Sequence, residues 1–194
     1  MRYLKFLVLG LFAMNLTACG IQSIPQSKNN VDAAMAEVTN QYKRRSDLIP
    51  NLVATVGGFA KQEKEVLVGV TEARAKATSI QIDPTKVTPE KLAQFQAAQG
   101  QLSQALGRLM VVTENYPQLK SDAGFRDLQA QLEGTENRIT IARQRHIQSI
   151  QEFNNLITVP PTSFTNSIMY RHPVMPQWGA DVTEAEKKTP EVKF

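Results

Sequence analysis

The chain carries one cysteine, Cys19, and two histidines, so few side chains offer a nucleophile or a soft metal ligand. A lone thiol forms no disulfide within its own chain, but it can act as a nucleophile or receive a covalent lipid. A metal site in a helical bundle uses carboxylates and histidines at helical spacing, such as Glu-x-x-His. Arg143 stands three residues before His146, and His172 has no ligand cluster nearby. We therefore expect no metal and no cofactor, and we interpret His146 as packed on a helix face.

The residues before Cys19 indicate what its thiol is for. Arg2 and Lys5 precede an apolar run over 6–16, and small residues follow it. This order is typical of a secretory signal peptide, and the run is shorter than the about 20 apolar residues that span a bilayer. Leu16-Thr17-Ala18-Cys19 resembles the bacterial lipobox, in which the cysteine is lipidated and becomes the first residue of the mature protein. We expect residues 1–18 to be removed and Cys19 to anchor the mature chain to a membrane.

The residue after the cysteine and the charge bear on location and partners. Gly20 follows Cys19, which by resemblance to bacterial lipoproteins favours the periplasmic face of the outer membrane, where the source has one. A plain signal peptide with an incidental cysteine and a retained transmembrane anchor are the alternatives. Loss of Arg2 and Lys5 lowers the formal charge from +4 to +2. A near-neutral exported domain with few aromatic residues does not favour nucleic acid as a partner.

Beyond the cleavage site, residues 19–30 are polar, and we interpret them as a flexible tether. From residue 31 to residue 80, apolar side chains recur in alternating steps of four and three, which predicts a helix with one buried face. Arg45 and Glu63 are the charged exceptions, and each could pair with a charge on a neighbouring helix. Pro50 leaves the phase unchanged, so we predict one long helix kinked near Pro50. The alternative is two helices, one ending near Arg45 and one starting at Asp47.

Two further long helices follow from capping residues and prolines. Thr88 and Pro89 can begin one helix, and Tyr116-Pro117 should stop it. The next helix should begin near Ser121 or Asp122 and end at Pro160-Pro161.

Short connections make long helical neighbours antiparallel. We predict an all-α, antiparallel up-and-down bundle of three long helices over 31–170, with a possible short fourth helix at 162–170. The residues from 171 to 194 contain three prolines and no sustained period, so we predict an extended C-terminal tail.

Two stretches of the sequence resemble a known family. The run Gln41-Tyr42-Lys43-Arg44-Arg45-Ser46-Asp47-Leu48-Ile49-Pro50-Asn51-Leu52-Val53 looks like the signature of the LemA family, and Glu114-Asn115-Tyr116-Pro117-Gln118-Leu119-Lys120 is a second match. The resemblance covers the chain from about residue 30 to its end. It implies an antiparallel helical bundle on a membrane anchor and leaves the biochemical activity open.

The sequence departs from the family pattern in two places. Members often carry two Tyr-Asn pairs on the last long helix, where this chain has His146-Ile147 and Phe153-Asn154. Many relatives use an uncleaved transmembrane helix where this chain has the lipobox.

The signature contains the candidate interaction surface, which comprises Arg44, Arg45, Asp47 and Asn51. These residues form either a solvated face, with Arg45 paired or extended to solvent, or a recognition surface at the predicted kink. We expect a membrane-anchored envelope lipoprotein that acts as a non-enzymatic helical scaffold or interaction module for unidentified envelope proteins. The alternatives are an enzyme or protease accessory in envelope remodelling and, with less support, a bundle that handles lipids or ions.

Overall fold

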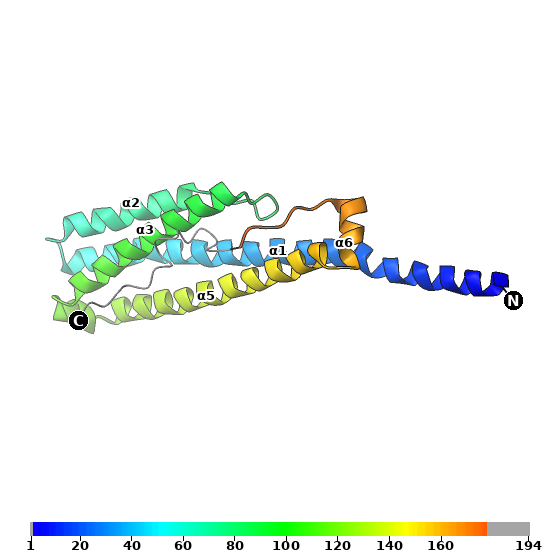
Figure 1. The fold of residues 1–194 in the computed structure, drawn as a ribbon. Helices are drawn as coiled ribbons and strands as arrows, with labels where there is room; N and C mark the ends of the chain where they lie inside the picture. Colours follow the sequence, from blue (N-terminus) through cyan, green and yellow to red (C-terminus); the bar gives the residue numbers. More distant parts are fainter. Residues whose placement is uncertain (1, 178–194) are drawn as a thin grey trace, which may run out of the picture. The chain divides into compact units, whose positions relative to one another are not determined.

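A computed structural model describes residues 2–177 of the chain, with side chains from Ile21 onward. Every regular element in this range is helical, and no strand occurs among the described residues. The prediction of an all-α helical bundle is therefore confirmed. The elements, shown in Figure 1, are α1 (Arg2–Phe59), α2 (Lys64–Ser79), α3 (Pro89–Thr113), α4 (Pro117–Ser121), α5 (Ala123–Thr158), α6 (Thr162–Thr165) and the π-helical turn η1 (Asn166–Tyr170).

The chain divides into two compact units. The central unit comprises residues 35–144, and the terminal unit comprises residues 1–34 and 145–194. Residues of α1 and α5 contribute to both units. Each unit has its own hydrophobic core, so each is described separately.

In the central unit, α1 and α2 form a helical hairpin. The predicted single helix over 31–80 is wrong, because α1 ends at Phe59 and α2 begins at Lys64. The fully buried Ala60 lies in the turn, where its carbonyl accepts from the Glu63 N–H at 3.1 Å. The apolar spacing stays in phase across this turn because both arms of the hairpin face one core, and a periodic pattern therefore conceals the break.

Pro50 lies inside α1, and the helix continues through it. Proline has no N–H, so the carbonyl of Ser46, four residues earlier, loses its intrahelical donor. The Arg74 Nε on α2 donates to that carbonyl at 2.8 Å. The alternative of two helices separated near residue 46 is therefore also wrong, and a bond from the neighbouring helix explains how α1 tolerates its proline.

The starts of α3 and α5 agree with the sequence. The Thr88 hydroxyl accepts from the Lys91 N–H at 3.3 Å, and Pro89 is the first residue of α3. The Asp122 carboxylate accepts from the Phe125 N–H at 2.8 Å and caps α5.

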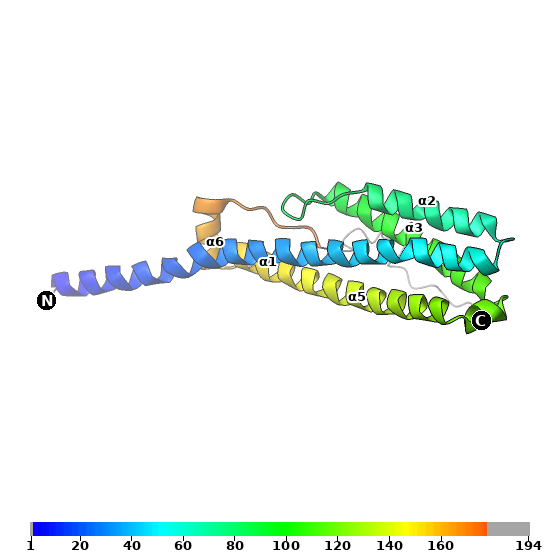
Figure 2. The same cartoon turned by 180° about the vertical axis from the view of Figure 1, so that it is seen from behind.

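The core of the central unit draws on all its helices, and α2 and α3 lie side by side (Figures 1 and 2). Because the first predicted helix is a hairpin, the unit contains four main helical segments rather than three. Its buried core residues are Ile49, Leu52, Val56, Ala60, Val70, Ala77, Leu102, Leu109, Leu119, Phe125 and Leu132.

The terminal unit shows that the predicted tether is wrong for residues 21–30, which are helical. Ile24 and Val31 are buried on Ile150, Phe153 and Ile157 of α5. Although the segment is polar in composition, Ile24 and Val31 fall on one helical face, and that face is buried.

A second proline lies inside α1 in this unit. Pro25 deprives the Ile21 carbonyl of its intrahelical donor, and the Tyr170 hydroxyl donates to that carbonyl at 2.7 Å. The arrangement repeats the one at Pro50, with a side chain from another segment supplying the missing donor.

The short helix predicted at 162–170 is present as α6 and η1, and α6 lies beside α1 (Figures 1 and 2). Residues 171–177 have no regular secondary structure, and the rest of the predicted extended tail, 178–194, lies outside the described residues. Within the described part of the chain, no helix contains a stretch that is long and apolar enough to cross a membrane.

Candidate functional site

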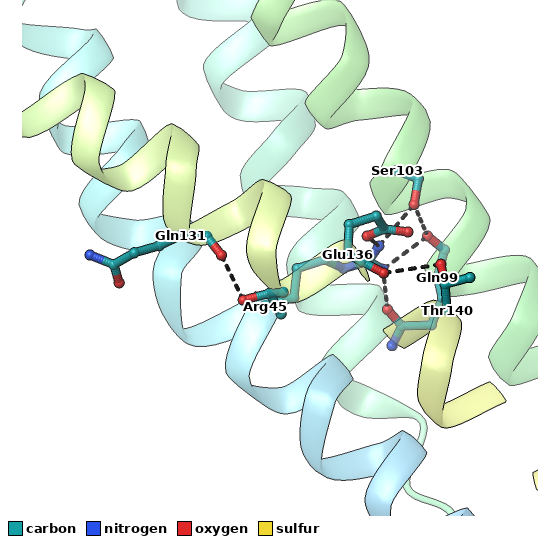
Figure 3. Close-up of polar contacts among 7 residues, drawn as sticks. Arg45, Gln99, Ser103, Gln131, Glu136 and Thr140 are labelled. Carbon is teal, nitrogen blue, oxygen red and sulfur yellow. Dashed lines mark hydrogen bonds and ion pairs between the residues drawn. The ribbon is translucent and has the colours of Figure 1, made fainter. Parts of the chain in front are cut away.

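Arg45 of α1 makes polar contacts with two other helices of the central unit. It is only 2% exposed. Its Nη1 donates to the Ser103 hydroxyl and to the Glu136 carboxylate, both at 3.0 Å. Its Nη2 donates to the Gln99 side-chain oxygen at 2.6 Å and to the Gln99 backbone carbonyl at 3.3 Å. Figure 3 shows Arg45 reaching α3 and α5 at one level of the bundle.

Aromatic rings complete the surroundings of Arg45. The guanidinium carbon lies 5.0 Å from the centre of the Tyr42 ring, and the Tyr42 and Phe95 rings meet edge to face at 5.1 Å. Burial raises the pKa of Tyr42 and outweighs the lowering effects of Arg143 and Arg45. The phenol therefore stays neutral, and the cluster binds the cation by hydrogen bonds and ring contacts.

This geometry corrects one sequence prediction and confirms another. Arg45 is not part of an accessible recognition surface, because its side chain is enclosed by α3 and α5. Its predicted pairing with a charge on a neighbouring helix is confirmed by the ion pair with Glu136. Glu63, the other charged position in the apolar pattern, accepts a hydrogen bond from the Tyr116 hydroxyl at 3.0 Å instead, and this bond raises the pKa of Tyr116.

The remaining residues of the candidate surface, Arg44, Asp47 and Asn51, are exposed on α1. Their spacing of three and four residues places them along one helical stripe. Within residues 21–177, no ion pair joins Arg44 or Asp47 to another side chain. The stripe thus presents both signs of charge to solvent.

A groove of about 400 Å³ borders this stripe. It lies where α1, the end of α2 and the start of α3 meet. Lys43 and Asp47 line it together with the half-buried Ile80 and Ile82. Sequence reasoning counted Ile80 as the last position of the apolar period, although it lies just after α2, and missed Ile82, which lies in the loop outside that period. The groove combines apolar walls with a basic and an acidic side chain.

Within the described part of the chain, no group of three His, Cys, Asp or Glu residues lies together in a way that could bind a metal ion. His146 is buried in the terminal unit. Burial lowers the pKa of His146, and the charge of Asp32 opposes this shift.

A family model matches residues 34–194, and its description is the LemA family. The chain belongs to the LemA family. The match covers the central unit and the described tail, so it confirms the resemblance of the sequence signature. The chain matches no curated protein.

The LemA signature at 41–53 contributes five buried residues to the bundle. Tyr42, Arg45, Ser46, Ile49 and Leu52 are buried. The motif therefore encodes the Arg45 cluster and the tolerated proline, which are features that fix how helices pack. Its exposed positions include Arg44, Asp47 and Asn51.

Asn154, of the Phe153-Asn154 pair, binds the start of the tail in this LemA protein. The Asn154 amide donates to the Met175 carbonyl at 3.0 Å, and its oxygen accepts from the Met175 N–H at 2.9 Å. Asn166 contacts His172 in the same two-bond manner, at 3.1 and 2.9 Å. The sequence analysis predicted neither Asn154 nor Asn166 as a contact of the tail. Its only indication of this region was the Phe153-Asn154 pair, which it noted as a departure from the family pattern.

Cys19, the predicted lipidation site, lies within the backbone range of α1, and its side chain is outside the described part. Lipidation therefore stays a prediction from the lipobox.

Proposed function

We propose that this LemA-family protein is a membrane-anchored envelope lipoprotein that acts as a non-enzymatic helical scaffold for a partner protein. The observation that carries the proposal is the exposed stripe of Arg44, Asp47 and Asn51 beside a groove with apolar walls. The stripe supplies charges that no ion pair within residues 21–177 engages, and the groove supplies a concave apolar surface. Together they suit a protein segment that carries an apolar side chain next to a charged one.

The polar interior supports a structural role over a catalytic one. The charged group buried most deeply near the groove is Arg45, and four hydrogen bonds to α3 and α5 engage its guanidinium. A catalytic cation would need donors directed at a substrate, whereas these are directed into the protein. The Arg45 cluster therefore supports a rigid scaffold.

The anchor in this proposal is the lipid on Cys19. Burial of acyl chains contributes about 0.8 kcal/mol per methylene, and stable anchoring takes two signals, such as two acyl chains. A lipoprotein cysteine with several chains meets this requirement without a membrane-spanning helix. The partner is then an envelope protein within reach of the same membrane.

Site-specific photo-crosslinking in intact cells tests the scaffold proposal. A photoreactive residue in place of Asp47 or Asn51 should give a covalent adduct of one defined size. Arg138 on α5 is an exposed position in the same unit and serves as the matched control. Adducts at 47 and 51 that are absent at 138 support the surface. No adduct above background, or the same adducts at all three positions, would refute it.

Mass spectrometry of the mature N-terminus tests the anchor. We expect the first residue to be Cys19 with acyl chains attached. A mature chain that starts elsewhere, or an unmodified Cys19, would refute the lipoprotein part of the proposal while leaving the crosslinking result interpretable.

A further inference from the structure

The terminal unit exposes a cluster of large apolar side chains at α6 and η1. Phe164, Ile168 and Met169 are 65%, 75% and 58% exposed. We call these three residues the apolar knob. Their spacing of four and one places them close together on a short helical segment. A soluble domain gains stability by burying such side chains, so a group of three left outside indicates an apolar environment that the described residues do not supply.

The knob is joined to the start of the mature chain. Tyr170, the residue after the knob, donates its hydroxyl hydrogen to the Ile21 carbonyl at 2.7 Å. Ile21 is exposed and lies two residues after Cys19, which is about 3 Å along a helix. Tyr170 thereby joins the end of the knob segment to the backbone two residues after Cys19.

The charges around the knob are those that suit an anionic surface. Residues 159–177 contain no aspartate or glutamate, and residues 16–27 contain no charged residue. Arg171, directly after Tyr170, is exposed. A basic side chain beside an apolar cluster, without acidic neighbours in sequence, is complementary to a membrane with anionic headgroups.

The knob is held in place by the chain that follows it. Asn166 at the start of η1 binds both the N–H and the carbonyl of His172. The His172 ring stacks on Tyr170 with the centres 5.8 Å apart and meets Phe153 edge to face at 5.6 Å. These contacts orient the segment, so the exposure of the knob is a feature of its fold.

We propose that the apolar knob inserts into the boundary between headgroups and acyl chains of the membrane that carries lipidated Cys19, with Arg171 among anionic headgroups. This inference rests on the lipid anchor of the proposed function. The knob then acts as a second membrane contact, which fixes the orientation of the terminal unit at the bilayer. The lack of acidic residues in the adjoining stretches 16–27 and 159–177 favours this membrane over a second copy of the chain or a partner protein as the occupant.

The mature lipidated protein offers a direct test, because lipidation occupies the sulfur of its single cysteine. Ile168→Cys then introduces the only free thiol, which takes an environment-sensitive fluorophore. The matched control is Val111→Cys on α3, where the native side chain is 70% exposed. Both proteins are reconstituted into vesicles of phosphatidylethanolamine and phosphatidylglycerol, and quenching by nitroxide lipids is compared with quenching by aqueous iodide.

We expect nitroxide lipids to quench the label at 168 several-fold more than the label at 111, and iodide to do the reverse. A label at 168 that iodide quenches as it does at 111 overturns the inference, and so does a label shielded from both quenchers, because a protein then covers the knob. Vesicle flotation separates the two proposals. If the protein floats with the vesicles but iodide quenches the label at 168, the insertion of the knob is refuted and the lipid anchor is not. If the protein does not float with the vesicles, both the lipid anchor and the insertion of the knob are refuted.

Discussion

Arg45→Met should destabilise the central unit far more than neutralising its ionic partner does. In the native protein, Arg45 donates to Gln99, Ser103 and Glu136 and lies over the Tyr42 ring. Methionine retains the apolar stem of the side chain and removes every donor. The Gln99 side-chain oxygen, which accepts at 2.6 Å within a buried residue, is then left without its partner.

The expected loss of stability in Arg45→Met follows from the buried acceptor that loses its donor. A buried acceptor that loses its donor costs about 1–3 kcal/mol, and the lost cation–ring contact adds about 1 kcal/mol. We therefore expect Arg45→Met to lower the free energy of unfolding by about 2–4 kcal/mol. Glu136 is different, because its side chain is 55% exposed and water solvates the carboxylate. Glu136→Gln keeps an oxygen that can accept from the Arg45 Nη1, so it should cost at most about 1 kcal/mol.

A double variant separates the buried acceptor from the charge. Arg45→Met with Gln99→Met replaces donor and acceptor by apolar groups of similar length, which removes the unsatisfied oxygen. We expect the double variant to recover at least about 1 kcal/mol relative to Arg45→Met, as a positive coupling between the two sites.

Urea unfolding of the chain from residue 19 onward, with Cys19→Ser, measures these differences. Far-UV circular dichroism should show that helix content is retained in each variant, while side-chain dispersion in proton spectra should decrease for Arg45→Met. A cost below about 0.5 kcal/mol for Arg45→Met would refute the reasoning. Equal costs for Arg45→Met and Glu136→Gln would show instead that the ion pair, and not the buried acceptor, determines the stability.

Three further predictions concern other contacts. Arg74→Leu should lower the free energy of unfolding by about 1–2 kcal/mol, because the Ser46 carbonyl loses its donor. In a Pro50→Ala background the same substitution should cost less than about 0.5 kcal/mol, because residue 50 regains an N–H. Equal costs in the two backgrounds, measured by urea unfolding, would contradict this explanation. Because burial lowers the pKa of His146 below its ordinary value of 6.5, its contribution to stability is complete above that pH and declines as the pH falls. Thermal unfolding across about pH 4 to 8 should show this slope, and His146→Leu should reduce it. Asn154→Ala should speed amide exchange of the tail backbone it binds about tenfold or more, and unchanged exchange would show that the contact is dispensable.

Much of the fold could be predicted because helices leave strong local signals. Thr88 and Asp122 cap α3 and α5 where their residue types suggested, and the short helix at 162–170 is present. A periodic pattern indicates which face of a helix is buried. The same pattern results whether one helix continues or the chain turns back into a second helix that faces the same core. For that reason the turn at residues 60–63 was missed. Leu52 and Val56 before it and Val70 and Ala77 after it are buried as expected, whereas Phe59 beside the turn is exposed.

Polar residues led to two wrong predictions, the tether at residues 21–30 and the exposure of Arg45. Residues 21–30 are polar overall, yet Ile24 and Val31 fall on one face and find a core on α5. Arg45 was placed on a candidate surface because charged residues are usually exposed. Two helices, α3 and α5, supply the acceptors that make its burial possible, and no local signal reveals acceptors 54 and 91 residues away.

The sequence by itself determined the all-α class, the family, the buried faces of the helices and the lipobox cysteine that predicts an anchor, because each of these depends on residue types at short spacing. The tertiary structure decided where α1 turns back, how the carbonyls freed by Pro25 and Pro50 are satisfied, that Arg45 lies inside while Arg44 and Asp47 lie outside, and that the apolar knob is left exposed. These features depend on groups far apart in the chain that meet only when the helices pack.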